Sequence, residues 1–258
     1  MLKDVIATVE FHLDGCSQLP LIAKTDAEGG KEMVCNQLSN VGAGLARSAI
    51  STSARSFFEI GNTVNTVPTS VSEDLRTWEQ LRAEAGQCNK CRLCEKRKNV
   101  VFGVGNMDNP KIVFVGEGPG ADEDAQGEPF VGKAGQLLTS AIEKGLKLKR
   151  SDVYICNVVK CRPPENRTPM EDEVNACVPY LYRQLTLLNP EVIVTLGQPA
   201  QKALSGVEMG ITKLRGQWQS WRGIKLMPTF HPAYILRNMS AKRPFWEDLQ
   251  AVMQEIGI

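Results

Sequence analysis

The sequence predicts a three-layer α/β/α fold that follows a poorly ordered N-terminal arm. From Ser72 onward, strand-like apolar runs alternate with helical patterns. The strands are apolar throughout, which is typical of a parallel sheet covered by helices on both faces. Residues 16–72 are instead rich in Ser, Thr, Asn, Gly and Ala without a sustained period, a composition that favours a disordered linker.

The N-terminal arm comprises residues 1–72. Spaced apolar side chains in residues 1–15 favour a short amphipathic helix that ends at Gly15. The arm is either a solvated tail or a segment that binds a protein partner, and the sequence leaves both interpretations open.

The folded domain is predicted to span residues 73–258. Its first helix lies in SEDLRTWEQLRAEAG, with Ser72 as the N-cap. Further candidates then follow in the order VVFG, KIVFVG, GQLLTSAIEKGL, VYICNVVK, MEDEVNACVPYLYRQLTLL and EVIVTLG. Ligands of open α/β sheets bind beyond the C-terminal ends of the strands. We therefore expect the ligand site at this edge of the sheet, formed by GEGPG, Asn157 and the segment after PTF.

Composition and charge exclude several classes of protein. No apolar run approaches the roughly 20 residues that span a bilayer, and the first residues lack the pattern of a signal peptide. We therefore expect a cytoplasmic monomer with no membrane partner. The net charge of +1 is by itself poor evidence for a nucleic-acid partner. However, residues 77–258 hold 24 basic and 20 acidic side chains, so this part of the chain is mildly basic.

The spacing of the eight cysteines predicts a metal site. Three of them form C-x2-C-x2-C at residues 88–94, and Cys161 and Cys177 follow far downstream. Thiolates from distant segments suit a [4Fe–4S] cluster, whereas a structural zinc site usually pairs two short C-x2-C hairpins. The predicted ligands are Cys88, Cys91, Cys161 and Cys177. Zinc and metal-free buried thiols remain alternatives, and Cys94 and Cys156 are interpreted as packing residues.

Two further motifs carry candidate chemistry. The glycine-rich segment VFVGEGPGADEDAQGEPFVGKAGQLL lets a backbone approach a ligand closely. It matches neither the P-loop nor the dinucleotide fingerprint, which argues against nucleoside triphosphate binding. In PTFHPAYILRN, His231 is followed by an apolar tip and then Arg237. Such a tip suits a wedge that enters a base stack, although an isolated histidine without a role is the alternative.

Together these blocks resemble the family 4 uracil-DNA glycosylases, the iron–sulfur branch of that superfamily. The resemblance spans about residues 77–258 and leaves the arm outside. It implies a central, mainly parallel sheet of four strands, an enzyme that releases uracil from DNA, and a [4Fe–4S] cofactor. The blocks that carry it are C-x2-C at 88–91, GEGPGADED with GEPFVGKAGQLL, NVVKCRPPENRTP, the Cys161 to Cys177 spacing, LGQPA and FHPAYILR.

The resemblance also implies roles for individual residues. Phe130 would stack on the flipped uracil, Asn157 would read its polar edge, and Glu123 would crowd the C5 position. His231 would donate a hydrogen bond to the uracil oxygen that gains charge, and Glu117 would place the water or stabilise the sugar cation. Gly118 stands in the substrate site where the family is expected to have alanine. The DNA wedge, centred on Ile235, would comprise Tyr234, Ile235, Leu236 and Arg237.

Two alternatives to this interpretation concern the chemistry. The chain could be a non-catalytic protein that recognises uracil or damaged DNA. It could also be an electron-transfer or radical enzyme, but S-adenosylmethionine radical enzymes use C-x3-C-x2-C, which is not present here. A related branch traps itself on the abasic sugar through a histidine between its third and fourth cysteines. Because RPPENRTP has no histidine, we expect turnover.

Overall fold

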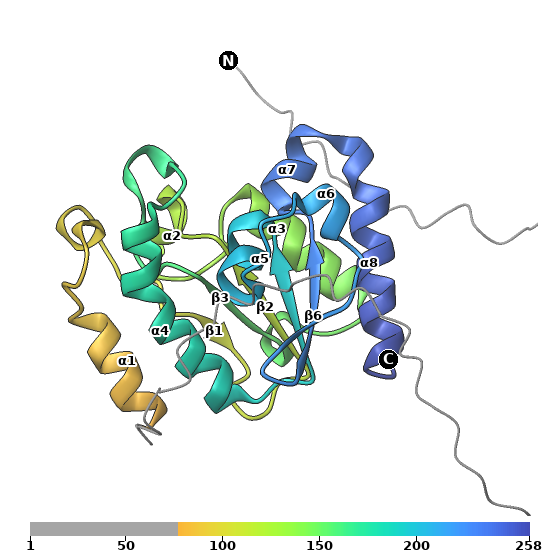
Figure 1. The fold of residues 1–258 in the computed structure, drawn as a ribbon, viewed down its shortest axis with the longest axis horizontal. Coiled ribbons are helices and arrows are strands. Elements are labelled where there is room, and N and C mark those ends of the chain that lie inside the picture. Colours follow the sequence, from red (N-terminus) through yellow and green to blue (C-terminus); the bar gives the residue numbers. More distant parts are fainter. Residues whose placement is uncertain (1–76) are drawn as a thin grey trace, which may run out of the picture. The chain divides into compact units, whose positions relative to one another are not determined.

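The computed structural model describes residues 77–258 (Figure 1). The short helix predicted in residues 1–15 and the linker predicted in residues 16–72 lie outside the described residues. No helix in the part described is long and apolar enough to cross a membrane.

A mostly parallel sheet forms the centre of the domain. Its strand order is β1-β3-β2-β4-β6-β5, and β3, β2, β4 and β6 are mutually parallel. Their number agrees with the predicted four, and β2, β3 and β4 lie in the predicted runs KIVFVG, VYICNVVK and EVIVTLG, while β6 ends within the PTF segment. The prediction of four strands missed β1 and β5, which pair antiparallel at the two edges and are too short to leave a clear apolar run. The strands are β1 Val104–Gly105, β2 Ile112–Gly116, β3 Tyr154–Asn157, β4 Val192–Leu196, β5 Gln219–Trp221 and β6 Ile224–Thr229.

Helices cover both faces of the sheet, as predicted (Figure 1). Side chains alternate along each strand, so Val113 and Val115 of β2 join one apolar core while Ile112 and Phe114 join the other. The first core includes residues of α1, α4 and α5, and the second includes residues of α3, α7 and α8. The α-helices are α1 Trp78–Gly86, α2 Ala121–Gln126, α3 Lys133–Ser140, α4 Glu171–Leu188, α5 Gln198–Ser205, α6 Ile211–Leu214, α7 Pro232–Arg237 and α8 Lys242–Glu255.

Short helical turns connect these elements. A π-helical turn, η2, continues α3 through Ala141–Gly145. The 3-10 turns are η1 Arg92–Glu95, η3 Arg150–Asp152, η4 Pro164–Asn166 and η5 Met239–Ala241. The turns η1 and η4 lie in the cysteine-bearing segments, and η3 leads into β3.

Two local predictions were wrong. The first helix begins at Trp78, and its N-cap is Thr77 and not Ser72, because Thr77 and Gln80 form a reciprocal capping box. VVFG is not a strand: Gly103 has a φ of 144°, and pairing with β3 begins only at Val104.

Candidate active site and thiol pocket

Loops at the C-terminal edge of the sheet enclose one open hollow, here called the edge pocket. It encloses about 1190 Å³, including its open mouth. β2 ends at Gly116, β3 ends at Asn157, and β6 ends two residues before His231. The structure therefore brings the segments that follow these strands together at the edge of the sheet where the sequence predicts the site. The predicted site residues that line the pocket are Glu117, Gly118, Glu123, Phe130, Asn157, His231, Tyr234 and Arg237.

Asn157 and Phe130 meet over Gly116 at the floor of the edge pocket. A Cβ atom at Gly116 would lie 2.4 Å from Asn157 Oδ1 and 2.6 Å from Phe130 Cζ, so only glycine fits there. Asn157 is 1% exposed, and its Oδ1 has no hydrogen-bond partner among the described residues. Because a buried polar atom without a partner is costly, this oxygen is a candidate for binding a ligand.

His231 presents a defined tautomer to the same pocket. Its Nδ1 accepts a hydrogen bond from the Ala233 backbone N–H at 3.1 Å, so in the neutral ring the proton resides on Nε2. Burial, aided by the charge of Arg237, lowers the pKa of His231 to about 4. The imidazole is therefore a neutral hydrogen-bond donor near pH 7. Its ring centroid lies 5.6 Å from that of Phe130.

Glu117 follows β2 directly and is the carboxylate next to Gly118 at the pocket wall. Burial raises its pKa, and a hydrogen bond from the Thr168 side chain opposes that shift. Gly118 packs closely against Val159, since a Cβ atom at Gly118 would lie 2.7 Å from Val159 Cγ2. An alanine, expected from the resemblance, therefore needs a small shift of that valine.

Glu123 lines the pocket but is also the anchor of the neighbouring loop. Its Oε1 accepts hydrogen bonds from the N–H groups of Val131 and Gly132, both at 3.0 Å, and its Oε2 accepts from Gly120 at 3.0 Å. The carboxylate thus holds residues 127–132, here called the Phe130 loop, against the start of α2. Three such bonds leave this side chain little freedom to rotate.

The predicted wedge is a helix, and its centre is buried. Residues Tyr234 to Arg237 belong to α7, and Ile235 is 0% exposed in the second apolar core. Ile235 is therefore not a wedge residue in this conformation, because one face of a helix packs inward while the opposite face is solvated. Tyr234 and Leu236 are 40% and 44% exposed, and Arg237 is also exposed.

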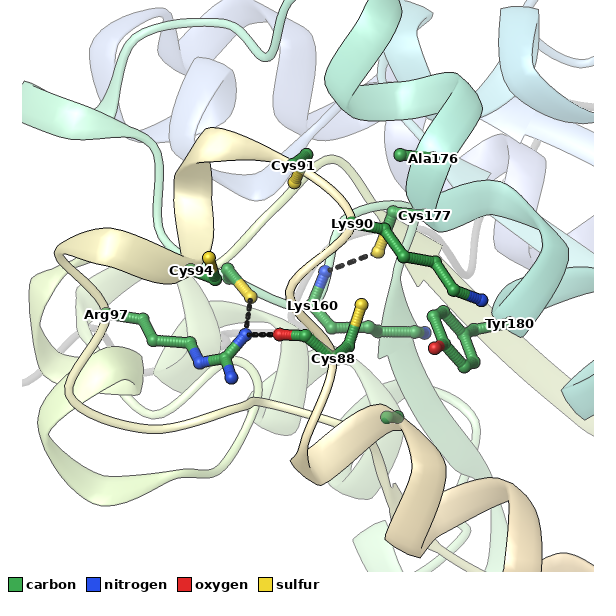
Figure 2. A pocket seen from close by; sticks show the side chains of 11 residues that line it. Cys88, Lys90, Cys91, Cys94, Arg97, Lys160, Ala176, Cys177 and Tyr180 are labelled. Carbon is green, nitrogen blue, oxygen red and sulfur yellow. Dashed lines mark hydrogen bonds between the residues drawn. The ribbon is translucent and has the colours of Figure 1, made fainter.

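The predicted metal ligands line a second hollow, here called the thiol pocket (Figure 2). The space between its atoms is about 320 Å³, open solvent included, and it is lined by Cys88, Cys91, Cys161 and Cys177 together with Cys94. None of the six described cysteines forms a disulfide. Cys94, which was interpreted as a packing residue, therefore lines the same pocket as the predicted ligands. Cys156 is fully buried in β3.

Backbone and side-chain donors face two of these sulfur atoms. Arg97 Nη1 donates to Cys161 Sγ at 3.3 Å and to the Cys88 carbonyl at 2.6 Å. The Lys160 N–H donates to Cys177 Sγ at 3.3 Å (Figure 2). Burial raises the pKa of Cys177 to about 12 and also raises that of Cys161. Burial therefore favours the protonated thiols of Cys161 and Cys177, and a bound metal ion would favour the thiolates. Within residues 77–258 no group of three or more His, Cys, Asp or Glu side chains is arranged to hold a single metal ion.

A buried lysine connects the two pockets. Lys160 is 2% exposed, and its Nζ donates to the Asn157 carbonyl at 2.7 Å and to Gln184 Oε1 at 2.5 Å. Gln184 in turn donates to the Phe102 carbonyl at 2.9 Å. The segment between Asn157 and Cys161 is therefore held from inside the core.

Sequence reasoning missed several residues of this site. Gly116, Thr168, Lys160 and Arg97 were not predicted as site residues, although Gly116 and Lys160 are each adjacent in the chain to a predicted site position. Gly116 had a signal, since it ends the buried strand that precedes GEGPG. The others depend on contacts across the fold that spacing along the chain does not reveal.

Comparison with known proteins agrees with this geometry. Residues 102–250 match the family model of the uracil DNA glycosylase superfamily. The chain is 51% identical over 168 residues to a type-4 uracil-DNA glycosylase of Thermotoga maritima, an alignment that covers 64% of this chain and 86% of that protein. It is 44% identical over 185 residues to that of Sulfurisphaera tokodaii, covering 68% and 83%. For that of Saccharolobus solfataricus the identity is 44% over 182 residues, covering 67% and 84%.

With this fold and this family match, the chain belongs to the uracil DNA glycosylase superfamily. More narrowly, the chain belongs to the type-4 uracil-DNA glycosylases. The resemblance predicted from the sequence blocks is confirmed.

Proposed function

We propose that this chain is a monofunctional uracil-DNA glycosylase of base excision repair. It flips uracil out of single- or double-stranded DNA, hydrolyses the N-glycosidic bond and leaves an abasic site. The observation that carries the proposal is the buried, unpaired Oδ1 of Asn157 beside the ring of Phe130 and the neutral imidazole of His231.

The pocket floor suits recognition of a flipped pyrimidine. Uracil N3–H is a donor and its O4 is an acceptor, and an amide side chain offers the matching acceptor and donor. Asn157 Oδ1 would accept from N3–H while its amide nitrogen donates to O4. Phe130 would stack on the base and offset the few kcal/mol that unstacking costs. Glu123 would crowd the C5 position, where thymine carries a methyl group.

His231 would stabilise the leaving base. As the glycosidic bond breaks, negative charge develops on the uracil O2, and a donor aimed at that oxygen lowers the barrier by about 3 kcal/mol. The Nε2–H of a neutral imidazole can make this bond without transferring a proton. Glu117, which also lines the edge pocket, would place the attacking water or stabilise the sugar cation.

The exposed face of α7 would fill the space left by the base. Tyr234, Leu236 and Arg237 are its solvent-facing residues, and an apolar side chain next to a cation suits insertion into a base stack. Ile235 is excluded from this role because it is buried.

The residues of the edge pocket favour hydrolysis without strand cleavage. A lyase needs an amine nucleophile, and none of the described residues that line the pocket is a lysine. The alternative function is binding of uracil or damaged DNA without catalysis.

The thiol pocket would hold the [4Fe–4S] cluster through Cys88, Cys91, Cys161 and Cys177. The donor set fits such a group, because these thiols line one hollow and two of them accept N–H bonds, which stabilise thiolate ligands. When bound, the cluster would tie the segment before η1, the end of the β3 loop and α4 together. Hydrolysis of a glycosidic bond moves no electrons, so this role is structural.

Two experiments test the proposal. Labelled oligonucleotides with one uracil should yield free uracil by chromatography and break only after alkali. His231→Ala and Asn157→Ala should each lose at least about a hundredfold in rate while keeping the cluster. Cleavage without alkali would show a lyase, and uracil binding without release would favour the non-catalytic alternative. The purified protein should be brown with about four irons per chain, and a colourless zinc protein would contradict the cluster.

A further inference from the structure

Phe130 has a backbone conformation that bulky residues rarely adopt. Its φ is 55°, in the left-handed region where a large side chain is strained. Strain of this kind persists only where the surroundings hold the backbone in place. The ring of Phe130 is nevertheless buried over Gly116 and beside His231. Some part of the structure must therefore hold the backbone of this residue.

Charged side chains hold the peptide groups on both sides of Phe130. The Pro129 carbonyl accepts a hydrogen bond from Arg150 Nη2 at 2.6 Å. The Val131 N–H donates to Glu123 Oε1 at 3.0 Å. Because φ and ψ of Phe130 describe how these two peptide planes are turned about its Cα atom, the two contacts together fix both angles.

Arg150 is itself anchored on the far side of the Phe130 loop. Its Nη1 donates to Thr139 Oγ1 of α3 at 2.9 Å, so the planar guanidinium bridges the loop to a helix. Gly135 lets α3 approach the loop closely, since a Cβ atom there would lie 1.8 Å from the Phe130 carbonyl oxygen. Arg150 does not line the edge pocket; with Thr139 it lines a separate hollow behind the ring.

We propose that Arg150 is a positioning residue for base recognition, which acts by fixing the strained backbone of Phe130. The inference deepens the proposed function and depends on the role of Phe130 there. Arg150 touches neither the base nor the pocket. Its guanidinium donates to the Pro129 carbonyl and so fixes the orientation of that peptide. The Phe130 ring is then already in place when the base arrives, and no conformational entropy is lost in ordering it.

The test is a double-substitution cycle in the full-length, cluster-loaded protein. The variants are Arg150→Met, Phe130→Ala and the pair combined, with single-turnover uracil release as the measurement. Arg150→Met should lower the rate at saturating DNA by about ten- to a hundredfold, the range for one lost charge-assisted hydrogen bond. KM should change little. In the Phe130→Ala background the same change should cost less than about twofold, because the two residues act as one unit.

Matched variants separate positioning from general stability. Arg150→Lys keeps the charge but not the two-pronged geometry, and should recover part of the rate. Arg222→Met removes an arginine that packs on Tyr182 and Trp221 and should have no effect on the rate. Hydrogen exchange of the peptide that contains Val131 should be faster in Arg150→Met and Arg150→Lys than in the wild type, whether or not uracil is released.

Three results would overturn the inference. They are a wild-type rate in Arg150→Met, an equal loss with and without Phe130, and unchanged exchange at Val131. Should Arg150→Met not fold, Arg150→Lys and its exchange pattern decide between the same outcomes. A wild-type protein that releases no uracil would instead remove the proposed function, and the exchange measurement would still report whether Arg150 holds the loop.

Discussion

The acid limit of the reaction should lie far below the ordinary pKa of histidine. His231 must be neutral to keep Nδ1 as the acceptor of the Ala233 N–H, which places the proton of the neutral ring on Nε2. With a pKa of about 4, about 97% of the imidazole is neutral at about pH 5.5, compared with about 9% for an unperturbed histidine. Uracil release at about pH 5.5 should therefore stay close to its neutral-pH rate. The acid limb of the pH–rate profile, where the rate falls, should lie near pH 4.

The assay is single-turnover release of uracil at saturating enzyme and constant ionic strength, from about pH 4 to pH 8. DNA binding and visible absorbance are followed in parallel, so that loss of substrate or cluster is not mistaken for titration. His231→Ala should be slower by about a hundredfold, the effect of one lost donor, and should lose the limb near pH 4. Arg237→Met should move the limb upward, because the charge of Arg237 helps to lower the pKa of His231.

A rate that rises as the pH falls through 6.5 would refute this reasoning, since it would require a protonated imidazole. A limb that stays at 6.5 would also refute it. The same shift affects stability: the pKa is about 4 when folded and 6.5 when unfolded, which corresponds to at most about 3 kcal/mol. This contribution is fully present above pH 6.5 and is lost as the pH falls toward 4, because the unfolded chain binds the extra proton in that window.

Three further predictions concern other parts of the chain. Gly116→Ala should lower the rate of uracil release by at least about tenfold, because its Cβ would lie 2.4 Å from Asn157 Oδ1 and 2.6 Å from Phe130 Cζ. The control is Gly86→Ala, whose Cβ would meet nothing within 4 Å. Equal rates in the two variants would contradict the packing argument. Lys160→Met removes the donor that bonds the Asn157 carbonyl and Gln184 Oε1. It should lower the free energy of unfolding by about 2 kcal/mol. An unchanged denaturation midpoint would show that these hydrogen bonds do not stabilise the fold. Removal of residues 1–72 should leave kcat/KM for uracil release and the melting temperature unchanged, since the edge pocket begins at Glu117; loss of folding on truncation would contradict the linker prediction.

The sequence determined the parallel sheet and the place of the site. Continuous apolar runs such as IVFVG, between turn residues, are typical of strands buried on both faces, and the residues after such strands meet at one edge. Glu117, Asn157 and His231 could therefore be placed together without coordinates. The C-x2-C spacing also indicated that Cys88 and Cys91 lie together, and both line the thiol pocket.

Residues whose position depends on contacts across the fold could not be predicted in this way. Cys94 lies in the thiol pocket, although spacing alone suggested packing. The edge strands β1 and β5 have too few residues to show a period. Thr77 rather than Ser72 begins the first helix, because its side chain and that of Gln80 bond each other's backbone.

The clearest differences concern single side chains at the site. Sequence placed Ile235 at an exposed tip, and only the packing of α7 against the second core decided that it is buried while Tyr234 and Leu236 face solvent. The sequence likewise named Phe130 but not the left-handed backbone that Arg150 and Glu123 hold. Periodicity and spacing follow from covalent neighbours and so can be read along the chain. The direction of a side chain depends on partners many residues away, which only the folded structure brings together.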